Sequence, residues 1–382
     1  MKQPGHEKKL EKVLNGRDVV VTAFGAMIGW GWVVSTGDWL QKAGSFGTII
    51  GFIIGGIMIY FVGLTYSELT TMIPKCGGEH VFSYIAFGPV GSFICTWAII
   101  LSYIGVVCFE ACSLPTIIQY IWPEFLRGYL YTVAGFDIYA TWLVLAVIVA
   151  VFITYINIRG IKTAAFLQTV LTFTIAGVGI ILVVASAING SSDNLKGQFL
   201  VGSDIENSLR NIISIATIAP FFLFGFDVIP QVAEEINVPL KKLGKLLVLS
   251  IVLAVLFYAL VVFSVSYAIS PVEVSESQHS TGLVTADAMA KVFNSSVMAK
   301  VAIIGGMCGI ITSWNSFMIG GSRALFALAE SYMIPHCFSR LHTKYKTPVL
   351  ALLWVNHFSY GFSPKCFRLS PSLTGQKINA VG

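Results

Sequence analysis

Charge is what this 382-residue chain has least of. Asp, Glu, Lys and Arg make up 11% of it and hydrophobic residues 55%, whereas a soluble domain carries roughly 25% charged residues. The net charge of +5 comes from Lys and Arg between long apolar runs, and these residues form no basic patch typical of nucleic-acid binding. The shortage of charge therefore excludes an ordinary soluble domain and predicts a polytopic membrane protein.

The chain also lacks the sequence patterns of enzymes and metal centres. Its seven cysteines include no C-x-x-C pair, and most lie in apolar runs, where a free thiol behaves as a small hydrophobic side chain. It contains no G-x-S-x-G, H-E-x-x-H or Walker pattern and no dinucleotide-binding fingerprint in a suitable context. We therefore expect no enzymatic activity, no resident metal and no cofactor.

Apolar runs of about 20 residues, the length that a helix needs to cross a bilayer, are numerous. Eight runs are long enough, and they cover residues 19–41, 46–70, 91–118, 138–157, 163–187, 209–230, 246–270 and 299–322. A ninth run begins after Pro348 and covers only residues 349–355. We expect an all-α membrane domain over residues 1–355, followed by a divergent polar tail over residues 356–382 that is unstructured or frame-shifted.

Lys and Arg are concentrated in the loops on the same side of these runs as the N-terminus. Because cytoplasmic loops of membrane proteins carry an excess of basic residues, this bias predicts an N-terminus in the cytoplasm and a location in the plasma membrane.

Three glycines interrupt the first apolar run. Gly25, Gly29 and Gly31 lie within seven residues, and each costs roughly 1 kcal/mol in a helix interior. Where a helix unwinds inside a membrane, the amides of its second half suit an anion and the carbonyls of its first half suit an ammonium group. We expect the amides of Trp30 and Gly31 to be the donors. Alternatively, Gly25 and Gly29 form a G-x-x-x-G face that packs against another helix.

The sixth apolar run is interrupted in a similar way. Pro220 removes an amide and Gly225 permits a non-helical turn. Phenylalanines at positions 221, 222, 224 and 226 surround these residues and would close over a substrate side chain; alternatively, they face lipid or the core. Asp227 follows, and a carboxylate at this depth is costly unless it is paired. Two interrupted runs about 200 residues apart are typical of a transporter built from an inverted repeat.

Glu110 is a carboxylate inside the third apolar run. An intramembrane carboxylate is a candidate functional group, here for neutralising a substrate ammonium or carrying a proton. The alternative is a carboxylate near the outer end of the helix, in contact with water. For Arg323, at the inner end of the eighth run, we expect a side chain that extends to the membrane interface, with a gating ion pair as the alternative.

Five motifs in order resemble the amino acid–polyamine–organocation (APC) superfamily of permeases. They lie at residues 24–32, 66–84, 157–162, 224–239 and 322–348. The first is the glycine segment of the first run, and the second contains Pro74 to His80, where the family has a tyrosine soon after a glycine pair. The match covers about residues 15–355, so the chain looks like a C-terminally truncated amino acid permease.

The resemblance implies a LeuT-like bundle of two inverted repeats, the first over about residues 19–187 and a partial second over about 209–355. It implies that the first and sixth helices hold an amino acid or related amine. The substrate-binding residues that it implies, with those of the interrupted runs, are Gly25, Ala26, Ile28, Gly29, Trp30, Gly31, Phe221, Phe224 and Gly225. Of these, Phe221 matches the family's aromatic gate.

Coupling residues are predicted from the same comparison and from the carboxylates. We expect Glu110, Phe226 and Asp227 to act in gating or coupling. The lysine that some proton-coupled relatives carry in the fifth helix has no counterpart here, where the matching position is Ile175. Thr312 and Ser313 are weaker candidates for a sodium site.

The sequence predicts secondary active transport of an amino acid or related amine by alternating access, proton-coupled or by exchange. The alternatives are a truncated fragment that does not transport and an amino acid sensor. The expected partners are a small-molecule substrate and the lipid bilayer, not nucleic acid, and the sequence leaves the oligomeric state open.

Overall fold

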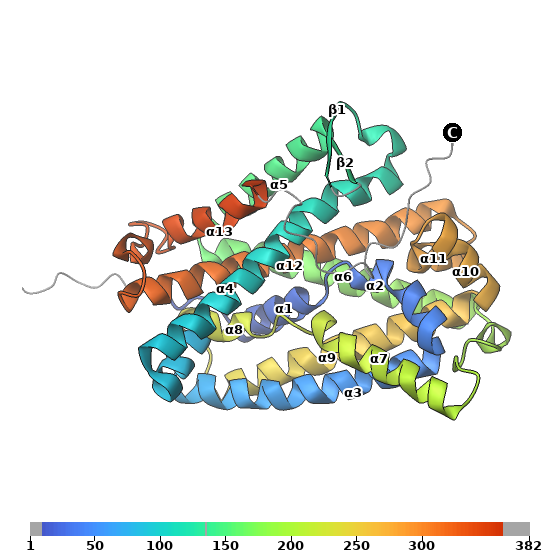
Figure 1. The fold of residues 1–382 in the computed structure, drawn as a ribbon, viewed down its shortest axis with the longest axis horizontal. Helices are drawn as coiled ribbons and strands as arrows, with labels where there is room; N and C mark the ends of the chain where they lie inside the picture. Colours follow the sequence, from blue (N-terminus) through green and yellow to red (C-terminus); the bar gives the residue numbers. More distant parts are fainter. Residues whose placement is uncertain (1–9, 134–135, 362–382) are drawn as a thin grey trace, which may run out of the picture.

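The computed structural model describes residues 10–133 and 136–361, and this part of the chain is dominated by α-helices (Figure 1). Six of the described helices are long and apolar enough to cross a membrane. They are α3 (Thr36–Met72), α4 (Glu79–Ile121), α5 (Ala140–Ile158), α6 (Ile161–Asn189), α9 (Leu240–Ala268) and α12 (Ser296–Glu330). The expected all-α membrane class is confirmed.

The first and sixth expected runs are absent from that set because the chain interrupts both. The first is divided into α1 (Gly16–Met27) and α2 (Gly31–Val34), and the sixth into α7 (Ile205–Phe222) and α8 (Val228–Gln231). Asn15 begins α1 with a capping box that it forms with Asp18. Both interruptions therefore lie where glycine and proline made a continuous helix unfavourable.

Two glycines bend the long helices α3 and α4. Gly44 (φ 73°) and Gly88 (φ 71°) adopt a left-handed conformation that a residue with a Cβ avoids. Gly44 lies between the first expected run, which ends at residue 41, and the second, which begins at residue 46. Ser35 keeps helical angles between α2 and α3, so the chain stays helical from Gly31 to the bend at Gly44.

Shorter elements connect the long helices. The antiparallel strands β1 (Tyr129–Val133) and β2 (Phe136–Tyr139) pair between α4 and α5, a hairpin that the sequence did not predict. The helices α10 (Pro271–Ser280) and α11 (Val284–Phe293) lie between α9 and α12. Single 3-10 turns complete the connections, at Pro123–Phe125, Ser192–Leu195, Ala233–Glu235 and His336–Ser339.

The last described helix, α13 (Val349–Gly361), continues six residues beyond the expected boundary at residue 355. The remainder of the expected polar tail, residues 362–382, lies outside the described residues.

The interrupted helix α1 lies in the middle of the bundle (Figure 1), between α12 and α4 on one side and α9 and α3 on the other. It contacts α6, α9 and α12. Glycines of α12 permit this close packing: a Cβ on Gly309 would lie 2.4 Å from the carbonyl oxygen of Gly29, and one on Gly306 would overlap the Trp30 ring. The core is thus built around the interruption.

We expect Gly309→Ala to lower the free energy of unfolding by about 1–3 kcal/mol, because overpacking against an immobile backbone forces the helices apart. The measurement is the thermal unfolding temperature in detergent. Gly105→Ala is the matched control, since a Cβ on Gly105 of α4 meets nothing within 4 Å. Equal unfolding temperatures for the two variants would contradict this packing.

Candidate functional site

The two interruptions meet at Ala26 and Gly225. A Cβ on Gly225 would lie 2.8 Å from the Cβ of Ala26 and 2.9 Å from its carbonyl carbon, and the φ of Gly225 is 129°. Both the space and the backbone angle therefore require glycine here. The structure brings together the segments that the sequence singled out about 200 residues apart.

Unpaired backbone amides mark the first interruption. The amide of Ile28 donates to the carbonyl of Phe24 (3.0 Å) and ends α1. Within the described part of the chain, the amides of Gly29, Trp30 and Gly31 donate no hydrogen bond. Trp30 caps the helical segment that follows, and its side chain makes no capping bond. Amides of this kind at the start of a helical segment suit an anionic group.

Glu110 lies directly beside these amides. Its side chain is 4% exposed and its Oε1 accepts a hydrogen bond from Ser313 of α12, while Oε2 has no partner among the described residues. A Cβ on Gly29 would lie 3.5 Å from Oε1. Glu110 is thus a buried carboxylate at the interruption of the first span, and the alternative of a water-exposed position near the helix end is wrong.

Asp227 organises the second interruption. It is 4% exposed, and its carboxylate accepts hydrogen bonds from the amide of Gly225 (3.1 Å) and from the hydroxyl of Tyr103 on α4. Phe226 is buried, and its ring meets Tyr66 of α3 edge-on at 5.5 Å. Asp227 therefore joins the turn at Gly225 to the neighbouring α4.

The aromatic residue beside the glycine segment is Phe222, the neighbour of the expected Phe221. Phe221 is 69% exposed and its ring meets only the edge of Phe222 among the described ring contacts. A Cβ on Gly31 would instead lie 2.5 Å from the Phe222 ring. Phe222 also packs against Trp39 at 4.8 Å. The structure does not bring Phe221 to the glycine segment, because one helical residue turns the side chain by about 100°.

Phe224, in the second interruption, contacts aromatic residues of α4 and α12. It stacks on Phe317 of α12 with ring centroids 5.5 Å apart, and Tyr103 is 6.1 Å away. Phe222 is thus an apolar neighbour of the first interruption and Phe224 an apolar residue of the second, while the amides and Glu110 are polar groups at the first.

The candidate sodium ligands already use their hydroxyl hydrogens. Thr312 donates to the carbonyl of Gly309 (2.9 Å), and Ser313 donates to Glu110. In the described residues no group of three or more His, Cys, Asp or Glu side chains is placed to hold a metal ion.

A buried amide network behind Gly25 escaped the sequence analysis. Asn157 of α5 donates to Asn315 of α12 (2.8 Å), which donates to Gln168 of α6 (2.8 Å). The Nε2 of Gln168 is 2.4 Å from the position of a Cβ on Gly25 and has no acceptor among the described residues. The polar α6 side chains nearest Gly25 are Gln168 and Thr172, one to two turns before Ile175. The signal in the sequence that could have revealed this network is the presence of the polar residues Asn157, Gln168 and Asn315 within apolar runs.

A buried ion pair joins α12 to the 3-10 turn that follows α8. The guanidinium of Arg323 donates to both oxygens of Glu235 (2.8 and 3.1 Å), and the two side chains are 0% and 2% exposed. The expectation that Arg323 extends to the membrane interface is therefore wrong. The carbonyl of Glu235 accepts the amides of Val13 and Leu14 (2.9 and 3.0 Å), which connects the start of α1 to the end of α8.

Comparison with known proteins finds permeases and transporters. The family model described as amino acid permease matches residues 18–378. The branched-chain amino acid permease BcaP of Bacillus subtilis is 25% identical over 90% of this chain and 73% of its own length. The methylthioribose transporter of the same species is 22% identical over 89% and 72%. The mouse large neutral amino acids transporter small subunit 2 is 26% identical over 86% and 60%.

Breaking the Arg323–Glu235 pair should destabilise the protein strongly. We expect Arg323→Met and Glu235→Gln each to lower the free energy of unfolding by about 3–5 kcal/mol, because each leaves a buried polar or charged partner uncompensated. The double variant should lose less than the sum of the two. Thermal unfolding of the four proteins in detergent tests this.

The exposed pair Arg127–Glu124 is the control for that experiment. Both side chains are more than 60% exposed, so Arg127→Met should change the free energy of unfolding by less than about 1 kcal/mol. If Arg127→Met and Arg323→Met lowered the free energy of unfolding equally, burial of the Arg323–Glu235 pair would have no effect on its importance for stability.

Proposed function

The chain belongs to the amino acid permease family, and from this premise we propose that it moves an amino acid or a related amine across the plasma membrane by alternating access. The family and its relatives are permeases, not enzymes. The two interrupted helices within a bundle of long apolar helices are the LeuT-like arrangement of this family. We propose that the first repeat covers about residues 19–187 and the second about 209–355.

The observation that carries the proposed site is the set of unpaired amides at Gly29, Trp30 and Gly31 beside a buried carboxylate. In our proposal these amides bind the substrate carboxylate, because they are unpaired donors at the start of a helical segment. The carbonyls of Gly25 and Ala26, at the end of α1, face the ammonium group, and the Oε2 of Glu110, which has no partner among the described residues, is available either to that ammonium or to a proton.

The second interruption supplies the side wall. Phe224 and Gly225 contact the substrate in this proposal, with Phe222 replacing Phe221 as the aromatic residue nearest to Gly31. An apolar wall suits a hydrophobic substrate side chain. The printed names of the relatives include branched-chain and large neutral amino acids, so leucine, isoleucine and valine are the first substrates to test.

We propose proton coupling or exchange in place of sodium coupling. Ser313 donates its hydroxyl hydrogen to Glu110 and Thr312 donates to a carbonyl of its own helix. These bonds leave the oxygen lone pairs open to a cation, so the case for a proton depends on the buried carboxylates. Glu110 and Asp227 are the buried carboxylates next to the two interruptions, and Phe226 anchors Asp227's segment to α3. The proposed orientation places the N-terminus in the cytoplasm, as the distribution of Lys and Arg predicts.

Uptake of radiolabelled leucine, isoleucine and valine into proteoliposomes tests the proposal. We expect saturable uptake that Gly29→Ala reduces at least tenfold, because its methyl group would meet Glu110 at 3.5 Å, an ordinary contact that narrows the site without breaking the fold. Gly105→Ala, at an open position of α4, is the matched control and should transport normally.

Binding without flux identifies the alternatives. Saturable binding that Gly29→Ala abolishes, with no uptake by the unmodified chain, would indicate a sensor or a fragment that does not transport. Equal uptake by Gly29→Ala and Gly105→Ala would show that the substrate binds elsewhere.

Replacing Glu110 by Gln tests coupling. If Glu110 carries the proton, Glu110→Gln should abolish uptake driven by a pH gradient while leaving exchange of internal for external leucine within about threefold of the unmodified chain. Loss of both activities, together with loss of leucine binding, would assign Glu110 to the substrate ammonium. Unchanged gradient-driven uptake would remove Glu110 from both roles.

A further inference from the structure

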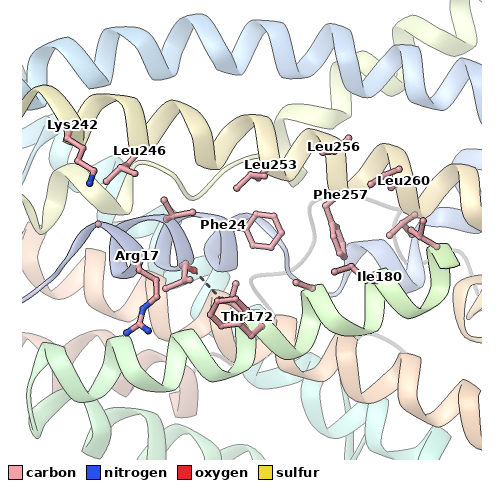
Figure 2. A pocket seen from close by; sticks show the side chains of 18 residues that line it. Arg17, Phe24, Thr172, Ile180, Lys242, Leu246, Leu253, Leu256, Phe257 and Leu260 are labelled. Carbon is pink, nitrogen blue, oxygen red and sulfur yellow. Dashed lines mark hydrogen bonds between the residues drawn. The ribbon is translucent and has the colours of Figure 1, made fainter. Parts of the chain in front are cut away.

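An apolar groove runs along the outside of the bundle between α1, α6 and α9 (Figure 2). Its volume is about 700 Å³, within the range of small-molecule sites. Phe173, Ile180 and Leu256 line it and are 60%, 62% and 51% exposed. Because α6 and α9 are membrane-spanning helices, these exposed apolar side chains show that the groove opens toward the lipid, away from the substrate site.

One end of the groove is basic. Figure 2 shows Lys242 on α9 and Arg17 at the start of α1, both at the end opposite Ile180 and Leu260. No Asp or Glu is among the described residues that line it. Arg17 is 3.8 Å from Asp18, but its side chain is 63% exposed and can turn to another anion. Charge and shape therefore differ along the groove, with two cations at one end and hydrocarbon along the rest.

The basic end lies at the depth of the lipid headgroups. Along α9 the lining runs from Lys242, two residues after the helix begins, to Val261. A rise of about 1.5 Å per residue makes this about 28 Å, close to the hydrocarbon thickness of about 30 Å. The groove thus follows the membrane normal, and Arg17 and Lys242 mark one boundary of the hydrocarbon.

We propose that this groove binds an anionic phospholipid of the surrounding membrane, with one acyl chain along α6 and α9 and the phosphate between Arg17 and Lys242. Charge complementarity selects this occupant: a zwitterionic lipid brings an ammonium of its own to the two cations, and a sterol offers them no charge. Basic residues next to membrane-spanning helices attract anionic headgroups in this way.

The lipid would contact the interrupted helix itself. Val21 and Phe24 of α1 line the groove, and Thr172 of α6 donates to the carbonyl of Val21 (3.2 Å; dashed in Figure 2). Phe24 also supplies the carbonyl that ends α1 at Ile28. A lipid bound here stabilises the described position of α1 and, by reciprocity, senses its movement. This consequence for transport depends on the proposed function, whereas lipid binding does not.

Native mass spectrometry of the full chain in detergent tests lipid binding without any transport. The probes are phosphatidylglycerol and phosphatidylcholine with identical acyl chains. We expect the chain to bind phosphatidylglycerol about tenfold more tightly, and Arg17→Gln/Lys242→Gln to remove this preference, since each basic residue near an anionic headgroup contributes about fivefold and Asp18 reduces the share of Arg17.

Lys241→Gln/Lys245→Gln is the matched control. These two lysines are exposed on the same helix and do not line the groove, so the control should keep its preference within about twofold. Equal binding of the two lipids by the unmodified chain, or equal losses in both double variants, would overturn the proposal.

Ala176→Phe distinguishes a lipid in the groove from one on the surface. Ala176 lines the middle of the groove, and a phenyl ring there should lower phosphatidylglycerol affinity at least fivefold with no fall in the thermal unfolding temperature. Undiminished affinity in a folded Ala176→Phe protein would place the lipid outside the groove. Because no flux is measured, failure here and failure of the proposed transport are independent results.

Discussion

Everything in this structure depends on exposing a few backbone amides inside a membrane without exposing them to lipid. An unsatisfied amide in hydrocarbon costs several kcal/mol, so the interruption of the first span has to be enclosed by protein. Glycines allow that enclosure, because Gly309 brings α12 against the carbonyl of Gly29 and Gly225 brings the second interruption against Ala26. Glycine at these positions therefore has two results: the helices pack closely, and unpaired amides stay available to an anion.

Polar side chains meet the same constraint in two ways. Asn157, Asn315 and Gln168 hydrogen-bond to one another across three helices and so bring no net charge into the bundle. Arg323 and Glu235 bring opposite charges, and their burial is tolerated because both oxygens of Glu235 are bonded. Among the groups left without a partner in the described residues are Oε2 of Glu110 and the amides of Gly29, Trp30 and Gly31, which lie next to the place where the interrupted spans meet.

The sequence predicts the long helices and the interruptions well, since glycine, proline and apolar run length act locally. The first interruption falls at Ile28–Trp30, inside the expected segment. What it does not predict depends on helical phase or on contacts between distant segments. Neighbouring phenylalanines look alike in sequence, yet Phe222 and not Phe221 faces Gly31. Arg323 is buried because Glu235, 88 residues away, is placed beside it. The β1–β2 hairpin follows no strong turn signal.

The backbone bonds between the start of α1 and the end of α8 have a mechanical consequence. Val13 and Leu14 bind the carbonyl of Glu235, and Asn237 binds that of Leu14 (2.8 Å), in a short parallel bridge. The segment before α1 and the segment after α8 are thereby joined by three backbone hydrogen bonds. Separating these two segments requires all three hydrogen bonds to break, so in the proposed transport cycle a movement of one segment carries the other with it as long as the bonds hold.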